Sequence, residues 1–124
     1  MGYESRIYIV DKGNIKNTEG LRWASVIATF EMGKYPELAD LFKKSKKTDC
    51  YIYADDGNTE IIKDRYDEFL TEANIDDVIA VLENGVYTET PYRRTLPLLV
   101  TLESIKCQIE TGYWTDIGIL HYGY

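Results

Sequence analysis

The sequence contains few of the residues on which disulfide-stabilised and metal-binding proteins depend. Its 124 residues include two cysteines, Cys50 and Cys107, and a single histidine, His121. Two distant cysteines fit neither a disulfide framework nor a metal or redox spacing, and one histidine excludes a multi-histidine metal site. We therefore expect both cysteines to be reduced and buried as small apolar side chains, and His121 to make an ordinary hydrogen bond at a strand end.

Long apolar runs and familiar catalytic motifs are also missing. No stretch approaches the roughly 18 apolar residues that cross a bilayer, and the N-terminus has no basic start followed by an apolar run. There is no glycine-rich phosphate loop, C-x-x-C, H-E-x-x-H or G-x-S-x-G pattern. These absences predict a cytoplasmic protein with no cofactor, and they leave NTPase, dinucleotide, zinc-finger, metalloprotease and serine-hydrolase chemistry unsupported.

What remains is the composition of one folded domain. The chain is 44% hydrophobic and 28% charged, which excludes low-complexity sequence and argues against wholesale disorder. At this length folding buries about two-thirds of the surface of the extended chain. We therefore expect a single domain over residues 1–124.

Alternating apolar residues predict strands, most clearly in the segment from Arg22 to Met32. There Ala24, Val26 and Ala28 would share one face with Phe30 and Met32, although the two alanines leave a helix as the competing interpretation. Turns are expected at 12–14, where Gly13 tolerates left-handed backbone, and at 55–58, with a polar loop at 15–21. The predicted strands are 3–11, 22–32, 50–54, 60–63 and 116–122.

Apolar residues at helical spacing predict three helices, at 37–44, 75–84 and 95–111. Asn74 would cap the second and Gly85 would end it, and Gly112 would close the third. Residues 64–73 are expected to form a short helix or an ordered loop. Together these elements predict an α+β fold: a mainly antiparallel sheet of about five strands with two to three helices on one face.

Negative charge is concentrated in the middle of the chain. The net charge is −7, yet residues 49–90 alone contain two basic and twelve acidic residues, a net charge of −10. Such a field repels phosphate backbones, which disfavours direct nucleic-acid binding, but it attracts a basic protein surface. A solvated face with helix capping explains the same acids without any function.

Acidic residues around Gly57 superficially resemble a calcium loop. The ligand spacing of an EF-hand is absent, so a hairpin turn explains them better. If a metal binds anywhere, the first candidates are Asp55, Asp56, Asn58 and Glu60. A small metal-dependent hydrolase or nuclease that combines Asp55, Asp56 and Glu60 with His121 is therefore one alternative function.

Eleven tyrosines are a further feature, and several lie on predicted strands, including Tyr8, Tyr51, Tyr53 and Tyr122. Tyrosine couples a large apolar ring to a polar tip, which suits sheet packing or an interface. Sheet packing is the simpler interpretation. A structural component that self-assembles through this sheet face, as a homo-oligomer, is the second alternative.

Three segments resemble small uncharacterised phage and prophage proteins of low-GC Gram-positive bacteria. They are residues 1–8, residues 53–59 and the ending Leu120-His121-Tyr122-Gly123-Tyr124. The resemblance implies an accessory protein in the cytoplasm of an infected or lysogenic host cell. It implies no known activity, so it assigns no catalytic residue.

The leading hypothesis is a phage-type accessory protein that binds a host or phage protein with a basic surface and is not an enzyme. Carboxylates would supply the charge, and aromatic residues would anchor the contact. No membrane or direct nucleic-acid partner is expected. The predicted partner-binding residues are Asp64, Tyr66, Asp67, Glu68, Phe69, Glu72, Asp76 and Asp77.

Overall fold

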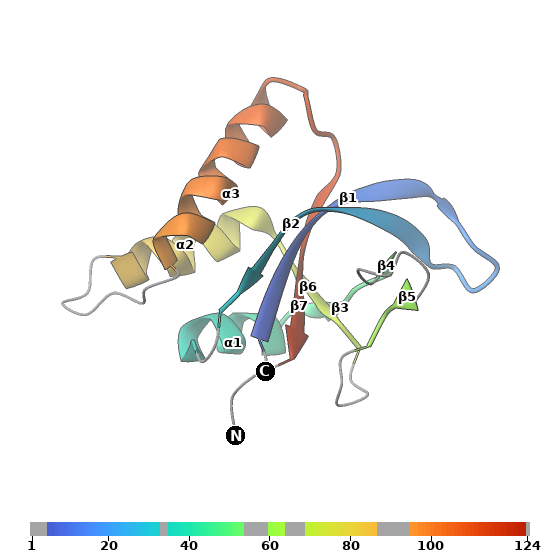
Figure 1. The fold of residues 1–124 in the computed structure, drawn as a ribbon, viewed down its shortest axis with the longest axis horizontal. Helices are drawn as coiled ribbons and strands as arrows, with labels where there is room; N and C mark the ends of the chain where they lie inside the picture. The colour runs from blue at the N-terminus through green and yellow to red at the C-terminus, as the bar shows by residue number, and fades with distance from the viewer. Residues whose placement is uncertain (1–4, 33–34, 54–59, 64–68, 87–94, 124) are drawn as a thin grey trace.

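Strands and helices are mixed along the chain rather than segregated (Figure 1). The computed structural model describes residues 5–32, 35–53, 60–63, 69–86 and 95–123. In chain order the elements are β1 (Ser5–Lys16), β2 (Arg22–Glu31), α1 (Pro36–Lys43), β3 (Lys46–Lys47), β4 (Cys50–Tyr53), β5 (Glu60–Ile61), β6 (Thr71–Ala73), α2 (Ile75–Val86), α3 (Thr95–Glu110) and β7 (Ile117–Gly123).

The strands form one sheet in the order β3-β6-β7-β1-β2-β4-β5, and every pairing is antiparallel except that of β2 with β4. The α+β class and the mainly antiparallel sheet are confirmed, but the described residues contain seven strands, so the prediction of about five was wrong. The additional strands, β3 and β6, are two and three residues long. Strands so short leave no alternating pattern, and residues 71–73 lie within the segment expected to be a helix or loop.

The segment 46–53 joins the two sides of the sheet. It carries β3, which pairs with β6, and β4, which pairs with β2 on the far side of β7 and β1. Between the two strands, the Thr48 amide donates to the Leu70 carbonyl at 2.9 Å and the Asp49 carbonyl accepts from the Arg22 amide at 2.8 Å. The sheet is therefore curled, with an inner and an outer face.

Each face of the sheet has its own apolar core. On the outer face, Ile7, Ile9 and Ile119 pack with side chains from all three helices, including Phe42, Leu82 and Leu102. The inner face encloses a smaller cluster: Tyr8, Val10, Ala24, Cys50, Ile52, Leu70 and Leu120. The placement of the helices on one face is thus confirmed, while the strands supply the second core.

An irregularity in the β1–β2 ladder changes which side chains of β2 share a face. Ile9 lies opposite Ala28 but Val10 lies opposite Val26, so Ile27 is an extra residue, as in a β-bulge. Ala24 consequently belongs to the inner core, whereas Ala28 packs against the outer one. The strand itself is confirmed, but the prediction that Ala24 and Ala28 share a face was wrong.

The predicted turn at 12–14 was also wrong, because β1 continues to Lys16. The chain reverses after Asn17, whose side-chain oxygen accepts from the amides of Glu19 and Leu21 at 2.9 and 3.0 Å. Gly20 follows with φ of 80°, a conformation that suits glycine. The predicted turn at 55–58 lies outside the described residues.

The helix signals were mostly correct. The Asn74 side chain accepts from the Asp76 amide at 2.8 Å, and Gly112, with φ of 86°, ends α3. Gly85 does not end α2, which continues to Val86. None of the helices in the described ranges is long and apolar enough to cross a membrane.

The two cysteines differ in environment. Cys50 is fully buried in the inner core, as predicted, but Cys107 is exposed. Cys107 lies two residues from both Ile105 and Ile109, a spacing that places it on the other side of the helix from these partly or fully buried side chains. The prediction that Cys107 is buried was therefore wrong.

Candidate functional site

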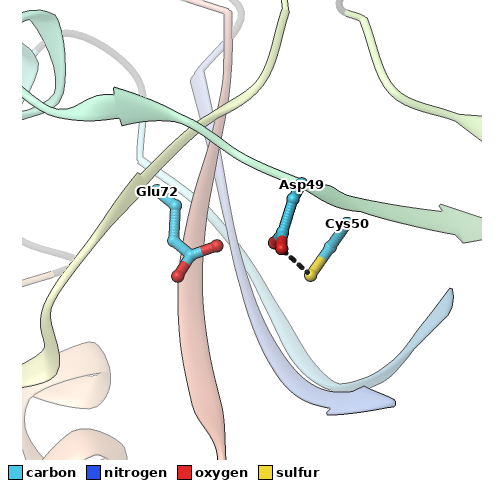
Figure 2. Close-up of side chains that lie close together, drawn as sticks. All are labelled: Asp49, Cys50 and Glu72. Carbon is cyan, nitrogen blue, oxygen red and sulfur yellow. Dashed lines mark hydrogen bonds between the residues drawn. The ribbon is translucent and has the colours of Figure 1, made fainter. Parts of the chain in front are cut away.

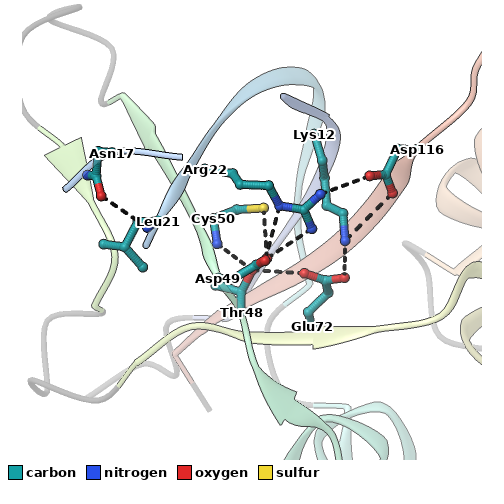
Figure 3. Close-up of polar contacts among 9 residues, drawn as sticks. All are labelled: Lys12, Asn17, Leu21, Arg22, Thr48, Asp49, Cys50, Glu72 and Asp116. Carbon is teal, nitrogen blue, oxygen red and sulfur yellow. Dashed lines mark hydrogen bonds and ion pairs between the residues drawn. The ribbon is translucent and has the colours of Figure 1, made fainter. Parts of the chain in front are cut away.

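Charged side chains from distant parts of the chain meet at one end of the inner face (Figure 3). Lys12 comes from β1, Arg22 from β2 and Glu72 from β6, while Asp49 lies between β3 and β4 and Asp116 immediately before β7. We call these five residues the ionic network. It contains two cations and three anions, so most of its charge is compensated internally.

The most buried pair in the network joins Lys12 and Glu72. The Lys12 Nζ donates to Glu72 Oε2 at 2.8 Å, and each side chain is only 8% exposed. Burial by itself lowers the pKa of Lys12, but the hydrogen bond and charge of Glu72, with the charge of Asp116, outweigh it and raise that pKa. Thr48 Oγ1 donates to the other Glu72 oxygen at 2.9 Å, so both carboxylate oxygens have partners.

Glycine makes room for this pair. Gly118 lies on β7, and a Cβ there would approach the Lys12 Cδ to 3.0 Å and the Glu72 Cδ to 3.5 Å. Glycine at position 118 therefore leaves the space that the side chains of Lys12 and Glu72 fill on the inner face.

Arg22 connects the other members of the network. Its Nε and Nη2 donate to the two oxygens of Asp49 at 3.0 and 3.2 Å, and its Nη1 donates to Asp116 at 3.0 Å. Burial alone would raise the pKa of Asp49, but the hydrogen bonds from Arg22 and Cys50 and the positive charges lower it. The two hydrogen bonds from Arg22 to Asp49 form the bidentate geometry in which arginine binds carboxylates most strongly.

The ligand atoms of Asp49, Cys50 and Glu72 lie within 4.8 Å of one another, close enough to consider a metal (Figure 2). Their environment argues against one. Burial raises the pKa of the Cys50 thiol to about 11, whereas a metal needs the thiolate. Both carboxylates already accept hydrogen bonds from cations, so an ion would have to displace Arg22 or Lys12. The cluster is better explained as part of a structural ionic network.

A shallow pocket of about 340 Å³ opens beside Glu72. Its walls carry both signs of charge, from Lys46, Glu72 and Asp76. The other lining residues are neutral: Ala73, Asn74, Ile75 and Ile117. Nothing in this lining selects an anion or a cation.

Among the predicted partner-binding residues, the structure describes four, Phe69, Glu72, Asp76 and Asp77, and these lie in different environments. Phe69 is exposed, and its ring lies 5.1 Å from the Lys47 Nζ and 4.8 Å from the Lys63 Nζ. Glu72 is buried in the ionic network. Asp76 pairs with Lys106 at 2.7 Å on the surface, and Asp77 is exposed. The remaining four, Asp64, Tyr66, Asp67 and Glu68, lie outside the described residues.

The residues of the alternative hydrolase are only partly described. Asp55, Asp56 and Asn58 lie outside the described residues, and Glu60 is exposed on β5. His121 is buried on β7, with its Nε2 2.9 Å from Ser5 Oγ and its ring stacked on Phe42. His121 is thus buried against Phe42, whereas Glu60 is exposed, so these two side chains do not share an open site.

Tyr51 and Tyr53, two of the strand tyrosines noted in the sequence, lie beside Trp23 where β2 and β4 run side by side. Trp23 is opposite Tyr51 in the register, and its ring centroid is 6.3 Å from that of Tyr53. The rings of Tyr51 and Tyr53 are 6.0 Å apart. Trp23 is 44% and Tyr53 39% exposed, and Tyr51 is half-buried. We call these three residues the aromatic surface.

Side chains alternate along a strand, so the sequence already indicated that Trp23 points away from Ala24. The same rule places Tyr51 and Tyr53 on one face of their own strand. The parallel pairing of Trp23 with Tyr51 was not evident, because a helix and another strand lie between β2 and β4 in the sequence. Comparisons with protein-family models, curated proteins and solved structures found no match for this chain. The case for a function therefore depends on this geometry.

Proposed function

We propose that this protein is a protein-binding accessory module and that the aromatic surface is its main contact. The observation that carries the proposal is three neighbouring aromatic side chains left partly in solvent on adjacent strands. Tryptophan and tyrosine are enriched among the residues that dominate interface energies. Other exposed apolar side chains include Val26 on the same strand as Trp23, Leu96 and Val100 one turn apart on α3, and Ile15 and Tyr113.

The charged groups support a binding role better than a catalytic one. In the described segments, Lys12, Arg22 and Glu72 are held in ion pairs, and the Cys50 thiol is kept protonated by burial. A nucleophile or general base needs a pKa near the working pH and access to substrate. We infer that these ion pairs hold the strands of the sheet in place and that their role is structural.

The proposal keeps the expectation that carboxylates attract a basic protein partner. Glu60 lies directly opposite Tyr53, and Asp55 and Asp56 follow Tyr53 in the sequence. A partner with a basic rim around an apolar recess would suit this combination. The phage-type origin and the cytoplasmic setting remain predictions.

The test is capture of partners from host-cell lysate by the tagged chain, followed by mass spectrometry, with three variants compared. Trp23→Ala and Tyr53→Ala should each lose a partner that the unchanged chain retains, because a hot-spot truncation costs about 2 kcal/mol or more, roughly a 30-fold loss of affinity. Tyr113→Ala, which removes an exposed aromatic residue elsewhere, should retain it. Thermal melts of each variant would separate lost binding from lost folding.

A partner retained equally by all variants would refute the proposal. The self-assembly alternative makes a different prediction, since the captured protein would then be a second copy of this chain. Light scattering distinguishes the two, because a monomer at micromolar concentration excludes assembly through this face.

A further inference from the structure

A carboxylate lies beside the aromatic surface. Glu60 pairs directly with Tyr53 across the β4–β5 ladder. Directly opposite residues in an antiparallel pair project to the same side with Cβ atoms about 4.5–5.5 Å apart. Glu60 is exposed, so its negative charge borders the rings on the solvent side.

Two other aromatic rings of the chain, those of Tyr122 and Phe69, lie close to cations. Arg6 lies 5.5 Å from the centroid of the Tyr122 ring, and Lys47 and Lys63 both lie near Phe69. Within the described ranges, no lysine or arginine lies over Trp23, Tyr51 or Tyr53. The aromatic surface thus offers ring faces, with an adjacent carboxylate, that no described cation of this chain occupies.

Glu60 places a negative charge beside these rings. Burial raises the pKa of Tyr51, and the proximity of Tyr53 and Glu60 raises it further. The chain as a whole carries −7. A cation approaching this surface is attracted by the ring quadrupoles, by Glu60 and by the overall charge.

We infer that the aromatic surface binds an arginine side chain of a basic partner segment, with the guanidinium packed against the rings of Trp23 and Tyr53 and its charge facing Glu60. Arginine fits better than lysine because its planar guanidinium stacks on rings and is more weakly hydrated. A nucleobase could stack on the same rings, but its phosphates would meet Glu60 and the negative chain. This inference rests on the proposed function and specifies the chemistry of the partner.

The test uses a short peptide of alternating glycine and arginine, titrated into the protein while the Trp23 indole N–H signal is followed by NMR. Matched peptides carry lysine or the neutral analogue citrulline in place of arginine. We expect a saturable shift with the arginine peptide, a weaker one with lysine and none with citrulline. The chain has two tryptophans, so the Trp114→Phe variant is used to assign the remaining indole signal to Trp23, and it leaves the aromatic surface unchanged.

Two charge variants complete the experiment. Glu60→Gln should weaken arginine-peptide binding about two- to five-fold, the range for one exposed ion pair. Glu103→Gln, the same charge change on the exposed side of α3, should leave binding unchanged. Equal effects of the two variants, equal binding of arginine and citrulline peptides, or saturable binding of an oligothymidylate in place of the peptide would overturn the inference.

Failure of this inference is distinguishable from failure of the proposed function. If Trp23→Ala loses a captured protein partner but the arginine peptide does not bind, the protein-binding function stands and the arginine chemistry is refuted. If the peptide binds but every lysate partner is retained by Trp23→Ala, the proposed function falls instead.

Discussion

Removal of the Lys12 ammonium should be among the most damaging single changes to this protein. In Lys12→Met the Glu72 carboxylate keeps the Thr48 hydroxyl but loses its cation, while its side chain stays 8% exposed. Removing one partner of a buried ion pair costs about 3–5 kcal/mol of folding free energy. We expect the lower end of this range, because Asp116, the second partner of Lys12, is partly exposed and stays hydrated when Lys12 is removed. A domain of this size is stable by about 5–15 kcal/mol, so such a loss is large.

Urea denaturation at neutral pH measures this loss. The double variant Lys12→Met/Glu72→Gln should recover much of it, since no uncompensated charge is left buried. Lys106→Met breaks the surface pair with Asp76 and should cost far less, because water screens that pair. A single variant within about 1 kcal/mol of the unchanged protein, or a double variant worse than Lys12→Met, would refute the reasoning.

Three further expectations follow from individual positions. Gly13→Ala should destabilise the protein by about 1–3 kcal/mol in denaturant titrations, because its Cβ would lie 2.6 Å from the Trp23 carbonyl oxygen. A thiol reagent should modify exposed Cys107 in the native protein but reach Cys50 only after denaturant is added, and two native reactive thiols would contradict the packing. The lowered pKa of Asp49 means that its contribution to stability is present above its ordinary value of 3.8 and is lost as the pH falls through the lowered value. Unfolding measured between about pH 2 and 5 should show this loss, and Asp49→Asn should reduce it.

Helical spacing and capping residues, which act over a few positions in the sequence, were sufficient to predict the helices. The stripe of Leu98, Leu102 and Ile105 is buried as the helical spacing required, and Asn74 caps α2. The turn after β1 was misplaced because Gly13 lies close to β2 and marks tight strand packing rather than a reversal. Asn17 and Gly20 carried an equally clear turn signal.

The candidate sites depended on contacts that no local rule supplies. Lys12 and Glu72 are 60 positions apart, and their contact requires the full order of strands. Trp23 and Tyr53 meet only because β2 and β4 pair in parallel. Charge counting placed the acids correctly along the chain, but it did not distinguish a buried, paired carboxylate such as Glu72 from an exposed one such as Glu60.

The position of β7 has a consequence for how the protein is made. Of the described strands, β7 comes last in sequence order, yet it pairs along β1, which comes first, from Ser5↔Gly123 to Asp11↔Ile117. During synthesis the ribosome must therefore release the chain as far as residue 123 before β1 acquires its second neighbour. Until then one edge of β1 can pair with other nascent chains, and a product truncated before residue 117 should aggregate rather than accumulate as a smaller folded protein.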